Sequence, residues 1–220
     1  MRIALASLLL ATAACSSAIG AERMVLAPAP AQDEALKAGP LKTAVFAGGC
    51  FWGVEGVFER VKGVQSVRSG YAGGARATAS YTLIGSGLTG HAEAVEIRYD
   101  PAKVSYGTLL RVFYSVAHNP TQLNYQGPDR GSQYRSAIFP QSPEQEKLAR
   151  AYVAQLEKAG TWGKIVTTFE AKKPFYLAED HHQDYLRANP TQPYIAINDI
   201  PKVEGLKRMF PALWSDRPAV

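Results

Sequence analysis

Cys50 is the residue of this 220-residue sequence whose type and surroundings most clearly suggest chemistry. It follows an apolar alternation and a Gly-Gly pair in the stretch TAVFAGGCFWGVEGVFERV, residues 43–61. The pattern predicts a strand over Lys42–Ala47, a turn, and a helix over Trp52–Val61. Free N–H groups and the positive end of the helix dipole converge on a sulfur at such a junction, which favours the thiolate and a nucleophilic role. The competing interpretation is a small core residue at a crowded turn.

Two aromatic residues follow the sulfur directly. Phe51 and Trp52 come before the apolar helical face begins. They form either an apolar wall beside Cys50 or an ordinary part of the core.

Glu93 is the carboxyl group best placed to assist a nucleophile. In HAEAVEIRYD, residues 91–100, Glu93 has the same parity as Val95 and Ile97, so it points to the apolar face of the predicted strand. Desolvation there raises the pKa of a carboxyl group and keeps it protonated near neutrality, as a general acid requires. The alternative is a hydrated glutamate at a frayed strand end. Tyr81 and Tyr134 are candidates to donate hydrogen bonds beside it, or else rim aromatics.

The histidines allow a different chemistry. His91 lies two residues before Glu93 on the same face, and a pair with Cys50 would indicate a Cys-dependent hydrolase. His118 is expected to be a cation at a helix C-terminus, and His181-His182 to lie in a charged helix. One thiol and no His spacing supported by carboxylates predict no metal site.

The order of the predicted elements indicates an α+β fold. The first six are β-α-β-β-α-β, the pattern of a two-layer ferredoxin-like sandwich, with additional helices and an unassigned C-terminal extension after it. The expected strands are 42–47, 64–71, 91–100, 133–139 and 165–169, and the expected helices are 52–61, 105 to about 118, 142–160 and a short one within 177–190.

The start of the chain reads as an export signal. Residues 1–21 have one Arg, no acid and an apolar run of signal-peptide length, too short to span a bilayer. Cleavage after small residues competes with lipoprotein processing at Cys15, and membrane attachment is expected only if Cys15 is lipidated. Residues 22–40 are expected to be an Ala/Pro-rich tether, and 41–215 one domain. The protein is thus predicted to be exported, either periplasmic or anchored by lipid facing the periplasm.

Charge and cysteine count exclude other classes. The formal net charge of +5 comes from scattered residues and shows no nucleic-acid footprint. The two cysteines are Cys15 and Cys50, and Cys15 is lost or acylated on either route, so the mature chain has one usable thiol and no disulfide framework. A third interpretation is an exported binding module with an inert thiol. It stands beside an enzyme that uses Cys50 with the acid Glu93 and a hydrolase that uses Cys50 with His91.

The sequence resembles the A-type peptide-methionine sulfoxide reductases. Five segments carry the resemblance over 42–194: GCFWG (49–53), GYAGG (70–74), SGLTGHAEAVEIRYDP (86–101), QGPDRGSQYRSAIF (126–139) and AEDHHQDYL (178–186). That family repairs one epimer of methionine sulfoxide.

The resemblance implies a role for each matching residue. Cys50 is then the nucleophile that becomes a sulfenic acid, and Glu93 the acid. Phe51 and Trp52 then form the pocket for the substrate's methyl group. Three further residues then hold the sulfoxide oxygen or organise its surroundings: Tyr81, Asp129 and Tyr134. It also implies a substrate, the S-sulfoxide of methionine, free or in oxidised proteins, and no bound metal or cofactor.

The chain departs from many family members after Cys50. No later cysteine is present, so no resolving cysteine can form an internal disulfide. We expect an external thiol, a thioredoxin-like protein or a small dithiol, to complete the cycle of a monomeric enzyme.

Overall fold

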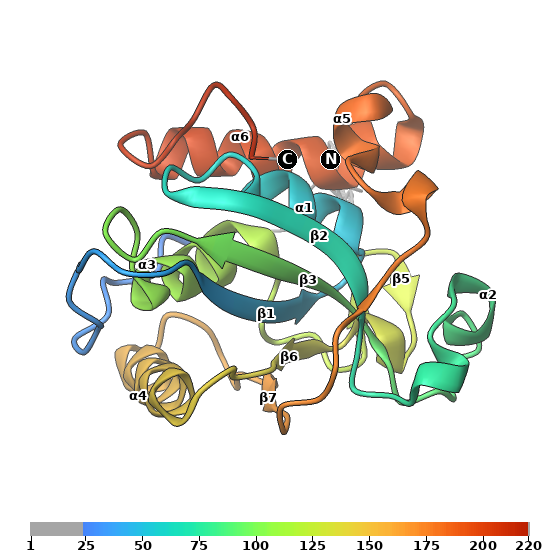
Figure 1. Cartoon of the computed structure of the whole chain (residues 1–220), viewed down its shortest axis with the longest axis horizontal. Coiled ribbons are helices and arrows are strands. Elements are labelled where there is room, and N and C mark those ends of the chain that lie inside the picture. Colours follow the sequence, from blue (N-terminus) through green and yellow to red (C-terminus); the bar gives the residue numbers. More distant parts are fainter. Residues whose placement is uncertain (1–23, 220) are drawn as a thin grey trace, which may run out of the picture.

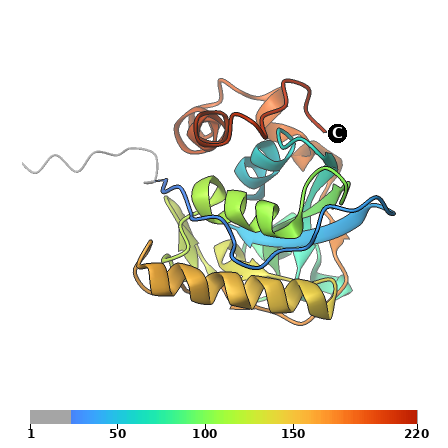
Figure 2. The same ribbon diagram turned by 90° about the vertical axis from the view of Figure 1, so that its left-hand side faces the viewer.

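The structure is a computed structural model that describes residues 24–219 (Figures 1 and 2). A six-stranded sheet has the order β7-β6-β1-β3-β2-β8. Its strands are β1 (Lys42–Gly48), β2 (Val64–Ala72), β3 (Ala92–Tyr99), β6 (Ser136–Ile138), β7 (Thr168–Phe169) and β8 (Tyr176–Leu177). Strands β4 (Tyr125–Gln126) and β5 (Asp129–Arg130) form a separate hairpin.

The four central strands have ferredoxin-like topology. β3 lies between β1 and β2 and is antiparallel to both, and β6 is antiparallel to the other side of β1. β7 adds a parallel strand beside β6, and β8 adds an antiparallel strand beside β2. The predicted α+β fold class is therefore confirmed, with two short edge strands added to it.

Six α-helices are present in residues 24–219, together with shorter helical turns. The α-helices are α1 (Phe51–Phe58), α2 (Tyr81–Ile84), α3 (Tyr106–Val112), α4 (Pro143–Ala159), α5 (Tyr185–Ala188) and α6 (Ile200–Met209). The turns are 3-10 at η1 (Arg76–Thr78), η3 (Ser132–Tyr134) and η4 (Asp180–His182), and π-helical at η2 (Phe113–Ala117) and η5 (Ile195–Asp199).

Local signals set the ends of α3 and α4. Ser105 caps α3 by accepting a hydrogen bond from Thr108 N–H at 3.1 Å. Ser142 caps α4 in the same way. The helix α4 ends at Gly160, which adopts a left-handed φ of 62° without strain because glycine has no Cβ. These three boundaries confirm the sequence prediction.

Other boundaries differ from the expectation. The strand predicted over 133–139 is limited to β6, because residues 132–134 form the turn η3 instead. The strand predicted over 165–169 has only the two residues of β7. The single helix expected within 177–190 is split into η4 and α5 by Asp184, which has a left-handed φ of 53°. The unassigned C-terminal extension contains η5 and α6.

The segment expected to be a tether lies against the domain as far as the structure describes it, from residue 24 onward. Ala27 is fully buried, and the backbone oxygen of Pro28 accepts a hydrogen bond from the hydroxyl of Tyr152 on α4 at 2.7 Å. Figure 2 shows this part of the chain running along the helical layer. The predicted signal peptide and Cys15 lie outside the described residues.

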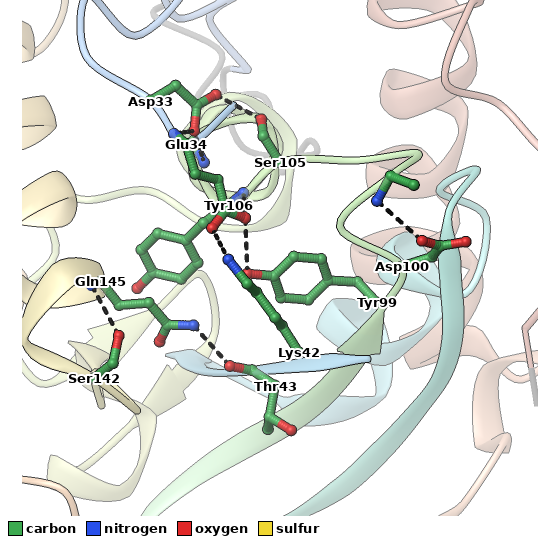
Figure 3. A network of polar contacts seen from close by, with 12 residues as sticks. Asp33, Glu34, Lys42, Thr43, Tyr99, Asp100, Ser105, Tyr106, Ser142 and Gln145 are labelled. Carbon is green, nitrogen blue, oxygen red and sulfur yellow. Dashed lines mark hydrogen bonds and ion pairs between the residues drawn. The ribbon is translucent and has the colours of Figure 1, made fainter. Parts of the chain in front are cut away.

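Two acidic residues fasten this N-terminal segment to α3 (Figure 3). Asp33 accepts a hydrogen bond from Gly107 N–H at 2.8 Å, and Glu34 accepts one from Tyr106 N–H at 2.9 Å. Glu34 also forms an ion pair with Lys42 at the start of β1. The carboxylates thus satisfy free N–H groups in the first turn of α3.

Candidate active site

Cys50 lies where β1 passes into α1. It is the N-cap residue of α1, and only 7% of its surface is exposed. Gly49 makes the turn with a φ of 89°, and a Cβ there would lie 2.5 Å from the Cβ of Gln126. The predicted strand–turn–helix position of the sulfur is confirmed.

Glu93 lies on β3 and faces the helices, as the parity of the strand predicted. It is 3% exposed and shares its face with buried Val95 and Ile97. Its Oε2 accepts a hydrogen bond from Phe51 N–H at 3.1 Å, next to Cys50 in the chain. Burial raises the pKa of Glu93 to about 8, although the Phe51 hydrogen bond opposes the shift. The predicted burial of this carboxyl group is confirmed, and the frayed, hydrated alternative is wrong.

The ionisation of Cys50 differs from the expectation. Burial raises its pKa well above the usual value, and the negative charges of Asp199 and Glu93 raise it further. Lys202 and the Trp52 N–H act in the opposite direction but are outweighed. Burial therefore opposes the thiolate that the helix start was predicted to favour.

The structure brings the remaining predicted residues around the same carboxyl group. Tyr81 starts α2 and Tyr134 ends η3, and the charges of Glu93, Cys50 and Asp129 all help to raise the pKa of both phenols after burial. Asp129 on β5 has a raised pKa, chiefly through burial, opposed by a short hydrogen bond from the Tyr194 hydroxyl. Elements far apart in the sequence thus converge on Glu93 and Cys50.

The wall beside the sulfur is built from more than Phe51 and Trp52. Phe51 is buried, and the indole of Trp52 stacks on Tyr185 with ring centroids 4.0 Å apart and an interplanar angle of 15°. The indole N–H donates to Nδ1 of His182 at 3.3 Å, and the ring of Tyr194 lies edge-on to the indole with ring centroids 6.2 Å apart. The indole is therefore held from two sides by residues of the C-terminal third.

Sequence reasoning missed His182, Tyr185 and Tyr194 as residues of the site. His182 was expected in a charged helix, yet it is buried against the rings of Phe51 and Tyr81. No periodicity marks these residues, because they lie in two short helical elements, η4 and α5, and at the N-cap of η5 rather than on one regular face. For His182 and Tyr185, the sign in the sequence is that both belong to the family-like segment AEDHHQDYL.

The other histidines have structural roles. Nδ1 of His91 accepts Gly74 N–H at 3.2 Å, and its Nε2 lies 3.0 Å from the oxygen of Ala75, so both ring nitrogens are engaged by backbone. This arrangement gives the Cys50–His91 hydrolase no support. His118 is buried, and desolvation lowers its pKa to about 3, so the expected C-terminal cation is wrong.

A buried charge pair from the C-terminal extension was also missed. Asp199 at the end of η5 is 0% exposed, and its Oδ1 lies 3.1 Å from Nζ of Lys202 on α6.

Across residues 24–219 no group of three or more His, Cys, Asp or Glu side chains is arranged to hold a metal ion. None of the helices in that range is long and apolar enough to cross a membrane.

A buried cysteine at the start of α1 and a buried carboxyl group that accepts the following backbone N–H, on a ferredoxin-like sheet, define a site for cysteine-dependent chemistry. Comparison with known proteins identifies the family. The peptide methionine sulfoxide reductase family matches residues 42–212, and the chain belongs to it.

Relatives and solved structures agree with this assignment. The chain is 59% identical over 180 residues to "Peptide methionine sulfoxide reductase MsrA 2" of Mesorhizobium japonicum, covering 81% of this chain and 92% of that protein. It is 52% identical over 171 residues to a protein of the same name from Synechocystis, with 76% and 78% covered. The crystal structure of reduced Mxr1 from Saccharomyces cerevisiae has a TM-score of 0.60 at 34% identity, covering 72% of this chain and 92% of that one. Methionine sulfoxide reductase A of Corynebacterium diphtheriae has the same TM-score at 33% identity, with 78% and 88% covered.

Proposed function

We propose that this protein reduces methionine S-sulfoxide, free or in oxidised proteins, to methionine, with Cys50 as the nucleophile and Glu93 as the acid. One observation carries the assignment of the acid: Glu93 is a buried carboxyl group bonded to the N–H of the residue after Cys50. Its raised pKa keeps the proton available at neutral pH. Reduction of methionine sulfoxide and protein repair are the activities of the family.

The reaction oxidises the cysteine as it reduces the substrate. Cys50 sulfur, after losing its proton, attacks the sulfoxide sulfur while Glu93 transfers a proton to the sulfoxide oxygen. The hydroxyl group then migrates from the substrate sulfur to the Cys50 sulfur, so the substrate's sulfur–oxygen bond and the new sulfur–sulfur bond both break, methionine leaves, and Cys50 becomes a sulfenic acid. The sulfoxide gains two electrons and Cys50 loses two, and the proton first held by the thiol restores Glu93.

The surrounding residues fit the two ends of the sulfoxide group. Phe51 and the Trp52 indole give an apolar surface for the methyl group, since the indole is fixed by Tyr185 and His182. The phenols of Tyr81 and Tyr134 are hydrogen-bond donors with raised pKa values beside Glu93, suited to hold the oxygen. Asp129 organises this side through its bond to Tyr194.

Recycling requires a thiol from outside the chain. No cysteine follows Cys50 in the sequence. An external thiol condenses with the sulfenic acid to give a mixed disulfide and water, and a second thiol releases Cys50 by exchange. Family enzymes use thiol reductants without a bound cofactor; for this chain we propose a thioredoxin-like protein, with a small dithiol as the laboratory substitute.

The N-terminal sequence supports a proposal on location. Residues 1–21 have the composition of a signal peptide, so we propose that the mature protein is exported to the periplasm as a monomer. Processing at Cys15 would instead leave it lipid-anchored and facing the periplasm. Metabolic labelling with palmitate separates the two, because only acylation at Cys15 gives a labelled chain that disappears in Cys15→Ala.

The experiment that tests the function combines separated epimers with counted turnover. The mature protein is incubated with excess S- or R-sulfoxide without reductant, and methionine is measured. We expect about one methionine per chain from the S epimer, then arrest, with one added oxygen on Cys50 that dimedone traps. Dithiothreitol should restore turnover. Product from a Cys50→Ser variant would refute the assignment, and two methionines per chain would show that a second thiol takes part.

A further inference from the structure

The side chain of Gln183 completes the backbone pairing at the edge of the sheet. β2 pairs with β8 through Gly70 and Leu177, and the next bond runs from Ala178 N–H to the oxygen of Ser69 at 3.0 Å. In a regular antiparallel pair the Ser69 N–H would donate back to the Ala178 oxygen. It donates instead to Oε1 of Gln183 at 3.0 Å, and Nε2 of Gln183 donates to the Ala178 oxygen at 3.1 Å. The amide therefore lies between two backbone groups at the point where β8 ends.

The same junction includes the helix that Cys50 caps. Nε2 of Gln183 also donates to the Ser69 oxygen at 3.0 Å, and Glu55 on α1 accepts the Ser69 N–H at 3.2 Å. Ser69 is fully buried and Glu55 is 1% exposed. Buried backbone groups are costly to leave without a partner. The bonds at Ser69 thus connect α1, β2 and the segment that follows β8.

The residues beside Gln183 are the ones that hold the indole of Trp52. His182 precedes it and accepts the indole N–H on Nδ1 at 3.3 Å, and Tyr185 follows two residues later and stacks on the indole. His182 is only 2% exposed, so its place is set by packing inside the protein. The amide of Gln183 therefore attaches to the sheet the short piece of chain that carries both supports of the indole.

This piece of chain depends on such contacts for its position. η4 and α5 have three and four residues, far fewer than a helix needs to be stable without tertiary contacts. Asp184 between them has a left-handed φ of 53°, which is unfavourable for a residue with a Cβ. Glu179 fixes the start of the piece by accepting hydrogen bonds from the Tyr71 hydroxyl at 2.7 Å and from Tyr81 N–H at 3.0 Å. Gln183 fixes it after η4, and α5 then contacts α1 (Figure 1).

We propose that Gln183 is a positioning residue of the substrate site: its amide keeps His182 and Tyr185 against Trp52, and so sets the shape of the apolar surface that receives the methyl group of the substrate. The role of that surface in binding sulfoxide rests on the proposed function. The orientation of the indole is a property of the protein without substrate, so it is tested separately.

The kinetic test replaces the amide without shortening the side chain. Gln183→Met removes every hydrogen bond of the amide and keeps its length. With methionine S-sulfoxide and dithiothreitol, kcat/KM should fall by about 2- to 13-fold, the factor that the net value of one hydrogen bond represents, mainly through KM. Gln183→Asn keeps an amide that is one methylene short of its partners, and it should raise KM in the same direction. The Asn variant decides the outcome if the Met variant does not fold.

A double variant shows whether Gln183 acts through the indole. In a Trp52→Ala background the side chain that Gln183 positions is absent. Adding Gln183→Met should then cause little further loss of kcat/KM, since residues that act through one contact are not additive. A further loss as large as that in wild type would contradict the proposal.

The indole N–H of Trp52 gives a readout that does not depend on turnover. Its signal in a proton–nitrogen correlation spectrum is assigned by its absence in Trp52→Phe. Because His182 accepts this N–H, its exchange with solvent should be faster in Gln183→Met than in wild type. Unchanged exchange in Gln183→Met would overturn the proposal.

Gln145 supplies a matched control for loss of stability. It is a buried glutamine on α4 whose Nε2 donates to the oxygen of Thr43 on β1 at 2.8 Å and whose Oε1 accepts Gln141 N–H at 2.9 Å. Gln145→Met removes the same group at another edge of the fold. It should lower the melting temperature while KM and the indole exchange stay at their wild-type values.

The outcomes separate the two proposals. An equal rise of KM in Gln145→Met and Gln183→Met would assign the effect to general destabilisation and overturn the role of Gln183. A fall in kcat with unchanged KM in Gln183→Met would also contradict it. If wild type forms no methionine from either epimer, the proposed function fails, and the indole exchange still decides whether Gln183 holds Trp52 in place.

Discussion

The backbone N–H of Phe51 donates a hydrogen bond of 3.1 Å to Oε2 of Glu93. This bond fixes the candidate acid relative to Phe51, the first residue of α1. Because Phe51 directly follows Cys50 in the chain, the bond also fixes the acid relative to Cys50. An amide oxygen can accept the same bond. Glutamine at residue 93 therefore preserves the contact while removing the transferable proton.

Glu93→Gln is expected to slow sulfoxide reduction in single turnover by roughly 10²- to 10⁴-fold, the loss typical of a missing general acid. Rapid-quench measurement of methionine at pH 7 gives the rate. Tyr81→Phe serves as a comparison that removes a phenolic donor and keeps Glu93. Unchanged rates in Glu93→Gln would mean that a tyrosine or water supplies the proton.

The same carboxyl group predicts an alkaline limit to activity. Because the pKa of Glu93 is raised to about 8, the fraction carrying the proton falls as the pH passes through that value. We expect the single-turnover rate of wild type, at subsaturating sulfoxide, to lose a contribution above about pH 8. The small residual rate of Glu93→Gln should lack this fall and follow only the ionisation of Cys50. Matching alkaline limbs in both proteins would assign the limb to another group.

The buried carboxyl group of Glu55 on α1 predicts how stability varies with pH. Glu55 is 1% exposed and accepts a hydrogen bond from Ser69 N–H at 3.2 Å, and burial raises its pKa from 4.5 to about 8. Between those two values the folded protein holds a proton that the unfolded chain has released, so stability decreases as the pH rises through this window.

Glu55→Gln should remove this loss, because a neutral amide resembles the protonated acid. Since one pKa unit corresponds to about 1.4 kcal/mol, the variant should exceed wild type in free energy of unfolding by on the order of a few kcal/mol at pH 9. The two proteins should be nearly equal at pH 5. Urea titrations at both pH values measure the difference. Asp180→Asn, at an exposed residue, is the matched control, and a gain that is equal at pH 5 and pH 9 would contradict the pKa assignment.

The stack between Trp52 and Tyr185 predicts a residue that acts on substrate affinity. Tyr185→Ala removes the ring that lies 4.0 Å from the indole, so the methyl-group wall loses its support. An aromatic pair contributes about 0.5–1.5 kcal/mol, so kcat/KM should fall by about 2- to 13-fold, mainly through KM. Tyr185→Phe keeps the ring and should behave like wild type. Equal kinetics for the Ala and Phe variants would exclude the role.

The contact between Asp33 and α3 predicts a stabilising role for the N-terminal segment. Asp33→Ala leaves Gly107 N–H without its carboxylate acceptor, a loss comparable to that of a helix cap, about 1 kcal/mol. The melting temperature should fall by a few degrees while the single-turnover rate stays near wild type. Asp33→Asn retains an acceptor oxygen and should lose less. Unaltered stability in Asp33→Ala would show that the segment contributes little to folding.

Much of the fold followed from local patterns. The alternation in β3 fixed which face Glu93 occupies, since a strand side chain is either on one face or the other. The caps of α3 and α4 were readable because Ser, Pro and Gly each satisfy a specific backbone requirement. Short edge strands such as β7 were poorly bounded, because two residues contain no period to detect.

The sequence by itself determined the family, the strand–turn–helix position of Cys50 and the buried face of Glu93, all of which depend on neighbours in the chain. Tertiary structure alone decided that His182 and Tyr185 hold Trp52 and that Asp199 and Lys202 lie on the first turn of α1. It also decided that burial raises the pKa of the Cys50 thiol. Burial and the charges of distant residues set a pKa through space, so no local pattern around Cys50 contains that information.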